Sequence, residues 1–314
     1  MQPKRIHLIV NPVSGRMKSK TGLIDIVDAL YRRGGEPDAE RRVTVSVTTH
    51  RGHGTRLAAL AASEGFDTVV ACGGDGTLNE VISGLMQIPE DQRPTLGYIP
   101  AGSTNDFASS LGLPTSLKSA AAMAVSEKTS ALDVGLFSPI GQDTLRKRHF
   151  SYIASFGIFT AASYSTPQAT KNILGNVAYL LEGVKDLGNI HSHHASFLLS
   201  DGRLVEGDYI FGAVTNTTSA GGLFKLPAGA VSMSDGEFEV FLVKNPRTLA
   251  ELNRIVTALM STDFEGCPLI EFHHTTSAIV TLSTPLSWSL DGEEAPGGTR
   301  VEIRCLPGVM RLRR

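Results

Sequence analysis

The chain has 314 residues, with 29 Lys and Arg against 31 Asp and Glu, so its formal net charge is −2. This near balance argues against a nucleic-acid partner, because nucleic-acid-binding domains usually carry a strong basic excess. The composition is that of a folded globular protein, and the length exceeds what one hydrophobic core usually fills, so two domains are expected. The 3 Cys have no metal-ligand spacing, which favours free thiols in a reducing cytoplasm.

Strands alternate with helices over the first 135 residues. Short apolar or β-branched runs predict strands at 6–10, 43–49, 68–72 and 96–99. Apolar residues at helical spacing lie between them, as at Leu78, Val81, Ile82 and Leu85. This alternation predicts an α/β domain whose parallel sheet is covered by helices on both faces.

Strand signals dominate beyond Asp133. Asp201-Gly202 is a hairpin-turn signal between apolar runs at 197–199 and 204–214. Further strands are expected at 238–243, 278–282, 286–290 and 301–305, and helices mainly at 167–186 and 249–259. We therefore predict an antiparallel, β-rich second domain. The uncharged stretch 149–170 is long enough to span a bilayer, but its Ser, Thr, Pro and Gln content argues against a membrane span.

Three glycine turns follow predicted strands of the first domain. They are Asn11–Arg16, Gly73–Thr77 and Pro100–Asp106, and each opens a helix. Because the carboxyl ends of parallel strands share one edge of a sheet, the three turns are expected to converge there. Glycine amides and a helix N-terminus together suit a phosphate group. The turns lack both the P-loop and the dinucleotide-binding patterns.

Two of these turns also carry an acid, Asp75 or Asp106, beside the hydroxyls of Thr77, Ser103 and Thr104. Carboxylates would repel a phosphate unless a cation lay between them, and Mg²⁺ is the usual cation in that position. Helix capping is the structural alternative for both acids and is compatible with a metal role.

The stretch Gly73–Val81 resembles the signature of the diacylglycerol kinase catalytic domain, and Asn11–Gly15 and Pro100–Phe107 resemble its first and third blocks. The likeness continues through 132–135, 164–183, 221–222, 235–236 and 290–293, so it covers essentially the whole chain. It points to the soluble bacterial branch, the DgkB/YegS-like lipid kinases. Gly73–Thr77 alone is shared with NAD kinases and resembles phosphofructokinases, whereas 78–81 and 104–107 favour a lipid kinase.

The resemblance implies an NAD kinase/phosphofructokinase-like α/β domain over 1–134, to which 306–314 return, and a β-rich lipid-substrate domain over 135–305. ATP would lie in the cleft between the domains. The residues expected along ATP are Asn11, Ser14, Gly15, Arg16, Gly73, Gly74, Gly76, Thr77, Asn79, Gly102, Ser103, Thr104, Asn105 and Asp106. The family often has Thr where this chain has Ser103, and the hydroxyl is kept.

The resemblance also implies catalytic and metal roles. Asp75 looks like the essential acid of a magnesium network, with Asn105 and Asp106 as its partners. Glu293 resembles the catalytic base, and Asp133 the acid that assists it. A structural Mg²⁺ site is expected at Asp235 with the backbone carbonyls of Ser232 and Glu237. Turn chemistry alone makes 291–298 a polar hairpin loop, and the whole-chain likeness favours the catalytic role instead.

The function expected on these grounds is an ATP- and Mg²⁺-dependent lipid kinase that converts diacylglycerol to phosphatidic acid. Alternatives are a kinase of another lipid alcohol or a sphingoid base, an NAD kinase, and a non-catalytic nucleotide-binding regulatory module. The protein is expected in the cytoplasm, docking peripherally on the membrane through 150–167. A homodimer is the expected assembly. Arg146-Lys147-Arg148 is interpreted as a short charged turn rather than a lipid contact. His191–His194 and His273-His274 are interpreted as solvated rather than metal-binding.

Overall fold

The computed structural model describes residues 4–15, 22–33, 36–38, 40–141, 146–158, 191–220, 224–226, 229, 231–264 and 266–314. They separate into two compact units, Met1–Asp133 with Gly308–Arg314, and Val134–Pro307. Several sequence predictions lie outside the described residues: Arg16, the helix at 167–186, the glycines at 221–222, and 159–167 of the proposed membrane-contacting segment.

The first unit is built on a sheet with the strand order β4–β1–β5–β6. The strands are β1 (Lys4–Val10), β4 (Arg41–Val47), β5 (Thr68–Gly73) and β6 (Thr95–Pro100). Each neighbouring pair runs parallel, with Leu8 beside both Val45 and Val70. β5 is buried along its whole length, as an apolar run covered on both faces requires. The carboxyl ends of these strands therefore share one edge.

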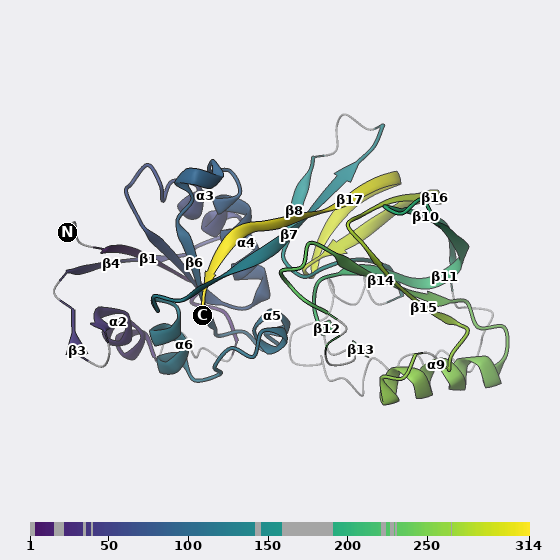
Figure 1. The fold of residues 1–314 in the computed structure, drawn as a ribbon, viewed down its shortest axis with the longest axis horizontal. Helices are drawn as coiled ribbons and strands as arrows, with labels where there is room; N and C mark the ends of the chain where they lie inside the picture. The colour runs from purple at the N-terminus through teal and green to yellow at the C-terminus, as the bar shows by residue number, and fades with distance from the viewer. Residues whose placement is uncertain are drawn as a thin grey trace. The chain divides into compact units, whose positions relative to one another are not determined.

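Helices cover both faces of this sheet (Figure 1). α2 (Leu23–Tyr31) and α6 (Leu117–Met123) pack together on one face, where Ile26 and Leu30 join Leu8 and Val70 in a core. α3 (His53–Ala59) and α4 (Asp75–Leu85) pack together on the other face. α2 ends at Tyr31, and the following Arg32–Arg33 (β2) pairs with Glu36–Pro37 (β3). The short elements η1 (Glu90–Gln92) and α5 (Asp106–Ser110) flank β6.

The second unit is a mainly antiparallel sheet. Its strands are β8 (Arg148–Phe150), β9 (Ile153–Gly157), β10 (His193–Leu199), β11 (Leu204–Thr215), β14 (Phe238–Lys244), β15 (Ile270–Thr275) and β16 (Ser277–Leu290), with most of β17 (Glu293–Arg313). A small hairpin joins β12 (Ser219–Ala220) and β13 (Phe224–Lys225). β7 (Thr129–Pro139) crosses the boundary and pairs with β8 through Gly135–Phe137. The predicted hairpin at Asp201-Gly202 joins β10 to β11, so that prediction is confirmed.

Aromatic packing forms the core of the second unit. Trp288 lies edge-on to Phe156 and Phe137, with ring centroids 4.9 and 5.4 Å apart. The edge-to-face packing of these buried rings favours one arrangement of the strands.

The predicted strands at 278–282 and 286–290 form the single strand β16. The register of β16 against β17 shifts between Thr281 and Leu286.

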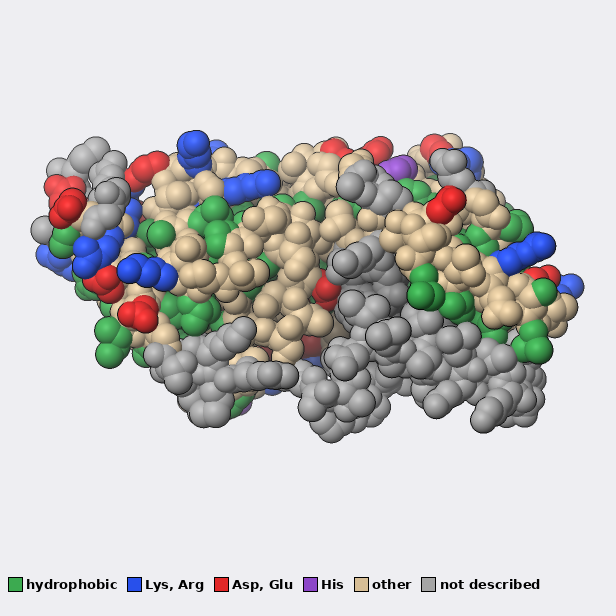
Figure 2. Space-filling model, turned by 90° about the horizontal axis from the view of Figure 1, so that it is seen from below, with side chains coloured by type: hydrophobic (Ala, Val, Ile, Leu, Met, Phe, Trp, Pro, Cys, Tyr) green, Lys and Arg blue, Asp and Glu red, His purple; other side chains and the backbone are tan. Residues whose placement is uncertain are grey.

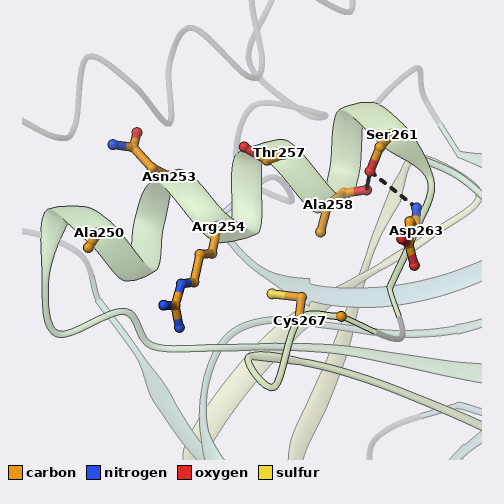
Figure 3. Close-up of a pocket in the computed structure, with 9 residues that line it drawn as sticks. Ala250, Asn253, Arg254, Thr257, Ala258, Ser261, Asp263 and Cys267 are labelled. Carbon is orange, nitrogen blue, oxygen red and sulfur yellow. Dashed lines mark hydrogen bonds between the residues drawn. The ribbon is translucent and has the colours of Figure 1, made fainter.

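One helix of the second unit, α9 (Leu249–Ser261), begins at Thr248, whose hydroxyl accepts the amide of Glu251. The buried side of the helix carries Leu252, Ile255 and Leu259. A cavity of about 330 Å³ runs along it (Figure 3), lined by Ala250, Asn253, Arg254, Thr257, Ala258, Ser261, Asp263, Gly266 and Cys267. None of these lining residues belongs to the predicted site.

Charged side chains of both signs are interspersed over the described residues on the face seen in Figure 2. No helix in the described part of the chain is long and apolar enough to cross a membrane.

Candidate functional site

The three glycine turns pack directly against one another at the carboxyl edge of β1, β5 and β6. A Cβ on Gly15 would lie 2.3 Å from the carbonyl oxygen of Ala101, and one on Gly102 would lie 2.5 Å from the Cα of Gly74. Both distances are too short for a side chain, so the turns meet backbone to backbone. Gly76 differs, because a Cβ there would meet no atom within 4 Å. Packing therefore explains Gly15 and Gly102 and leaves Gly76 facing open space.

Side chains of the predicted site fasten the turns together. The Asn11 amide donates to the Thr77 hydroxyl at 3.1 Å, and the Ser14 hydroxyl accepts the amide of Gly74 at 3.3 Å. Asn105, at φ 54°, both accepts the amide of Gly102 (2.8 Å) and donates to its carbonyl (3.0 Å). The structure therefore brings the residues from all three turns into one polar junction.

Asp75 links the second turn to the third. Its side chain is buried, and its two oxygens accept the backbone amides of Asp106 (3.1 Å) and Phe107 (3.3 Å). These amides open α5, so Asp75 caps that helix rather than α4, whose N-terminus has no side-chain cap. Helix capping by Asp75 is therefore confirmed, and the capped helix is α5 rather than the one that Asp75 itself begins. Asp106 is buried as well, so two acids lie within one protected junction.

The remaining predicted residues of this edge differ in exposure. Asn79 is buried one turn into α4, whereas Ser103 and Thr104 are exposed. Tyr98, which sequence reasoning treated only as part of a strand, donates its hydroxyl to the carbonyl of Gly73 at 3.4 Å. Burial raises the pKa of Tyr98 well above 10, and the negative charges of Asp75 and Asp106 add to the effect. Tyr98 is therefore neutral, and its hydroxyl contacts the first residue of the second turn.

A fourth loop, Thr48–His53, lies at the same edge and was missed. The amide and the hydroxyl of Thr48 both donate to the carbonyl of Val10, at the end of β1. The Glu80 carboxylate accepts the amides of Gly52 (2.7 Å) and Gly54 (2.9 Å), which ties the loop to α4. The sequence feature that could have predicted this loop was the position of Thr48-Thr49 at the end of a predicted parallel strand.

The acid pair of the first unit has the donor set that Mg²⁺ uses. Mg²⁺ usually keeps several waters and takes only one or two carboxylates together with substrate phosphates. Among the described residues, no group of three or more His, Cys, Asp or Glu side chains could hold a metal, so Asp75 and Asp106 could contribute at most such a two-carboxylate site. In the second unit, Asp235 and Ser232 are exposed, and Asp235 accepts the amide of Glu237 at 3.1 Å across a turn with Gly236 at φ 81°.

Asp133 lies at the end of the first unit. It is fully buried, and its Oδ1 accepts the amide of Gly308 at 2.7 Å. Gly308 has φ 61° and belongs to the segment that returns to the first unit. This bond fastens the returning segment to β7.

Glu293 follows a two-residue turn between β16 and β17. Asp291 (φ 51°) and Gly292 (φ 86°) have the left-handed conformations of such a turn, and Leu290 pairs with Glu293 across it. The loop interpretation of 291–298 is wrong, because β17 begins at Glu293 and stays paired with β16 up to Gly298. The Glu293 carboxylate lies 2.9 Å from Nη2 of Arg148. Arg148 belongs to β8, so the charged-turn interpretation is also wrong for this residue.

Asp291 was not singled out in the sequence, although its side chain is among the most heavily bonded in the second unit. It is 4% exposed, and its Oδ2 accepts the amide and the hydroxyl of Ser151 at 2.5 and 2.6 Å. Its Oδ1 accepts the amides of Tyr152 and Ile153, each at 3.0 Å. Burial raises the pKa of Asp291, and these hydrogen bonds oppose that rise.

Comparison with known proteins is consistent with the motifs at this site. Residues 5–137 match the diacylglycerol kinase catalytic domain. The chain is 34% identical to a diacylglycerol kinase of Bacillus subtilis over 292 residues, which cover 92% of this chain and 90% of that protein. It also superimposes on a solved structure from Bacillus anthracis assigned to the diacylglycerol kinases, with a TM-score of 0.78, 25% identity, and coverage of 100% and 96%.

The fold extends beyond lipid kinases. A yeast NADH kinase structure matches with a TM-score of 0.51 and 10% identity, covering 99% of this chain and 83% of that one, which is a likeness of fold alone. The identity and coverage against the Bacillus subtilis enzyme, together with the matched catalytic domain, decide the family. The chain belongs to the bacterial diacylglycerol kinase family of DgkB/YegS-like proteins and is a lipid kinase.

Proposed function

We propose that this lipid kinase transfers the γ-phosphate of ATP to the hydroxyl of diacylglycerol, giving phosphatidic acid, and that the transfer depends on Mg²⁺. The observation that carries the proposal is the buried acid pair Asp75 and Asp106 at the junction of the three glycine turns. Phosphoryl transfer relies on positioning and charge neutralisation more than on covalent chemistry of the protein. A rigid junction with two acids and an open approach at Gly76 suits both requirements.

The predicted site residues have the following roles in this proposal. Asp75 and Asp106 would hold Mg²⁺, which would neutralise phosphate charge when bound. The turns from Asn11 to Gly15 and from Gly73 to Thr77 would lie along the phosphates, with Arg16 and Gly102–Asn105 as further contacts. Glu293 would accept the proton of the acceptor hydroxyl, and Asp133 would assist it, an assignment that rests on the family likeness. Asp235, Ser232 and Glu237 would hold a structural Mg²⁺.

An acceptor panel tests the reaction. The full chain is incubated with γ-labelled ATP, with or without Mg²⁺, and with vesicles that contain diacylglycerol, sphingosine or a prenol alcohol; NAD is supplied in solution. We expect labelled phosphatidic acid in the diacylglycerol reaction and loss of the label when EDTA removes Mg²⁺. Label only in another lipid would reassign the acceptor, and label only in NAD would replace the proposal with an NAD kinase.

Glu293→Gln tests the base. The amide keeps the size of the side chain but cannot accept the proton, so kcat should fall at least about 10²-fold, the lower end of what a positioned base contributes. ATP affinity, measured by equilibrium binding, should stay within about twofold of the wild-type value. Wild-type turnover in this variant would refute the assignment of Glu293.

The lipid acceptor requires contact with a membrane, so we also propose that the protein docks peripherally. We propose separately that it forms a homodimer. The uncharged segment 150–167 is the proposed contact, of which the structure describes 150–158. Flotation with diacylglycerol vesicles tests docking, and recovery of all the protein in the lipid-free fraction would contradict it. Sedimentation equilibrium tests the dimer, which a single monomeric mass across the micromolar range would exclude.

A further inference from the structure

Arg148 of β8 holds Glu293, the first residue of β17. Its Nη2 donates to Oε2 of the Glu293 carboxylate at 2.9 Å, and its Nη1 donates to the backbone carbonyl of Glu294 at 2.7 Å. The two bonds of this guanidinium fork therefore engage both the side chain of Glu293 and the backbone carbonyl of the next residue. Arg148 is 30% exposed and Glu293 22%, so the pair is partly shielded from water.

The turn that carries Glu293 is fastened to the same segment of chain. Asp291 accepts four hydrogen bonds from Ser151, Tyr152 and Ile153, and its amide donates to the carbonyl of Ile153 at 2.9 Å. The segment Arg148–Ile153 thus fixes the backbone of the turn through Asp291 and the side chain of Glu293 through Arg148. Glycine at 292 (φ 86°) supplies the remaining turn conformation.

We propose that Arg148 is a positioning residue for Glu293: it orients the carboxylate toward the acceptor, while Asp291 locks the turn beneath it. The inference rests on the proposed role of Glu293 as base. The guanidinium fork limits the side-chain rotation that would carry the carboxylate away from a reacting hydroxyl.

Other charged groups lie near this pair. The Asp291 carboxylate is occupied by its hydrogen bonds with Ser151–Ile153. Glu294 follows Glu293 on β17, and because side chains alternate between the faces of a strand, its side chain is expected on the opposite face. His149 is next to Arg148 on β8 and is likewise expected on the opposite face. Arg148 makes the ion pair with Glu293, so its loss should directly change the orientation of that carboxylate.

The test is steady-state kinetics on the full chain with ATP, Mg²⁺ and diacylglycerol vesicles. In Arg148→Met, kcat should fall about tenfold because the carboxylate is no longer held in place. The KM for ATP should not change. Arg148→Lys keeps the charge but loses the fork, so its kcat should also be lowered. Arg146→Met removes the same type of side chain from an exposed position nearby and should leave both quantities unchanged.

The outcomes separate the inference from the proposed function. If Glu293→Gln is inactive and Arg148→Met has the wild-type kcat, the positioning role is overturned and the assignment of Glu293 as base stands. A raised KM for vesicles in Arg148→Met, with an unchanged kcat, would make Arg148 a lipid contact and would also overturn the proposal. An active Glu293→Gln would overturn both the positioning role and the assignment of Glu293 as base. If Arg148→Met fails to fold, Arg148→Lys decides, because a wild-type kcat in that variant contradicts the need for the fork.

Discussion

The replacement Asp75→Asn separates the capping role of this residue from its proposed role in phosphoryl transfer. The Asp75 oxygens accept the amides of Asp106 and Phe107, and Asn offers one acceptor oxygen while its NH₂ group faces the other amide. The variant therefore keeps part of the cap and removes the negative charge. Asp75 is buried beside the acid Asp106, so loss of one charge also removes a repulsion between carboxylates.

The structural cost of this change is modest. A lost hydrogen bond to a charged group contributes about 1.5–3 kcal/mol, and the removed repulsion offsets part of that, so we expect a loss of about 1–2 kcal/mol. A stability of roughly 5–15 kcal/mol for a domain leaves the variant folded at 25 °C. The expected loss of turnover is about 10³-fold, which corresponds to about 4 kcal/mol of barrier. Unfolding therefore cannot account for it.

The assay compares unfolding in EDTA with turnover across a Mg²⁺ titration. Asp67→Asn is the matched control, because Asp67 accepts the amide of Arg5 at 2.8 Å away from the glycine turns. The control should lose a comparable or smaller amount of stability and keep full activity. If Asp75→Asn retains more than a tenth of the wild-type kcat with an unchanged Mg²⁺ dependence, Asp75 is only a cap and the reasoning fails.

Two further predictions concern the same edge of the sheet. Gly102→Ala places a Cβ 2.5 Å from the Cα of Gly74, so we expect a loss of about 1–3 kcal/mol in thermal unfolding and weaker ATP binding. Gly76→Ala meets no atom and serves as its packing control; an unfolding midpoint for Gly102→Ala equal to that of the wild type would contradict the packing argument. Burial raises the pKa of the Cys72 thiol to about 12, so a thiol-specific reagent at pH 8 should modify Cys72 only after denaturation. Mass spectrometry of the native protein would contradict this if Cys72 were modified as fast as a free thiol.

Local patterns predicted the elements of the first unit well, for identifiable reasons. The expected strands at 6–10, 68–72 and 96–99 lie within β1, β5 and β6, because buried strands require continuous apolar runs. β8 and β15 were not predicted. β8 has only three residues, two of them Arg148 and His149, and β15 carries His273 and His274, so neither has an apolar pattern. Both exist because of their partners β7 and β14.

The site was harder to foresee than the fold. Convergence of the glycine turns follows from the shared edge of parallel strands and needs only local signals. The contacts of Asp291 with Ser151 and of Arg148 with Glu293 span 140 and 145 positions in the chain. No local pattern encodes such pairs, so Arg148 looked like part of a charged turn and Asp291 like an ordinary turn residue.

The structure also changes which residues of the glycine turns are informative about function. Glycine after a strand was taken to permit close approach of a phosphate, yet Gly15 and Gly102 are required by contacts between the turns themselves. Their presence would be explained in a protein that binds no nucleotide. Asp75 and Asp106 are different, because contacts between the turns do not require two neighbouring buried acids, and carboxylates are the ligands that a cation beside phosphates uses. With a net charge of only −2, the chain can accommodate a triphosphate if Mg²⁺ supplies the positive charge at this pair. The acids, more than the glycines, are therefore the residues on which the kinase activity should depend.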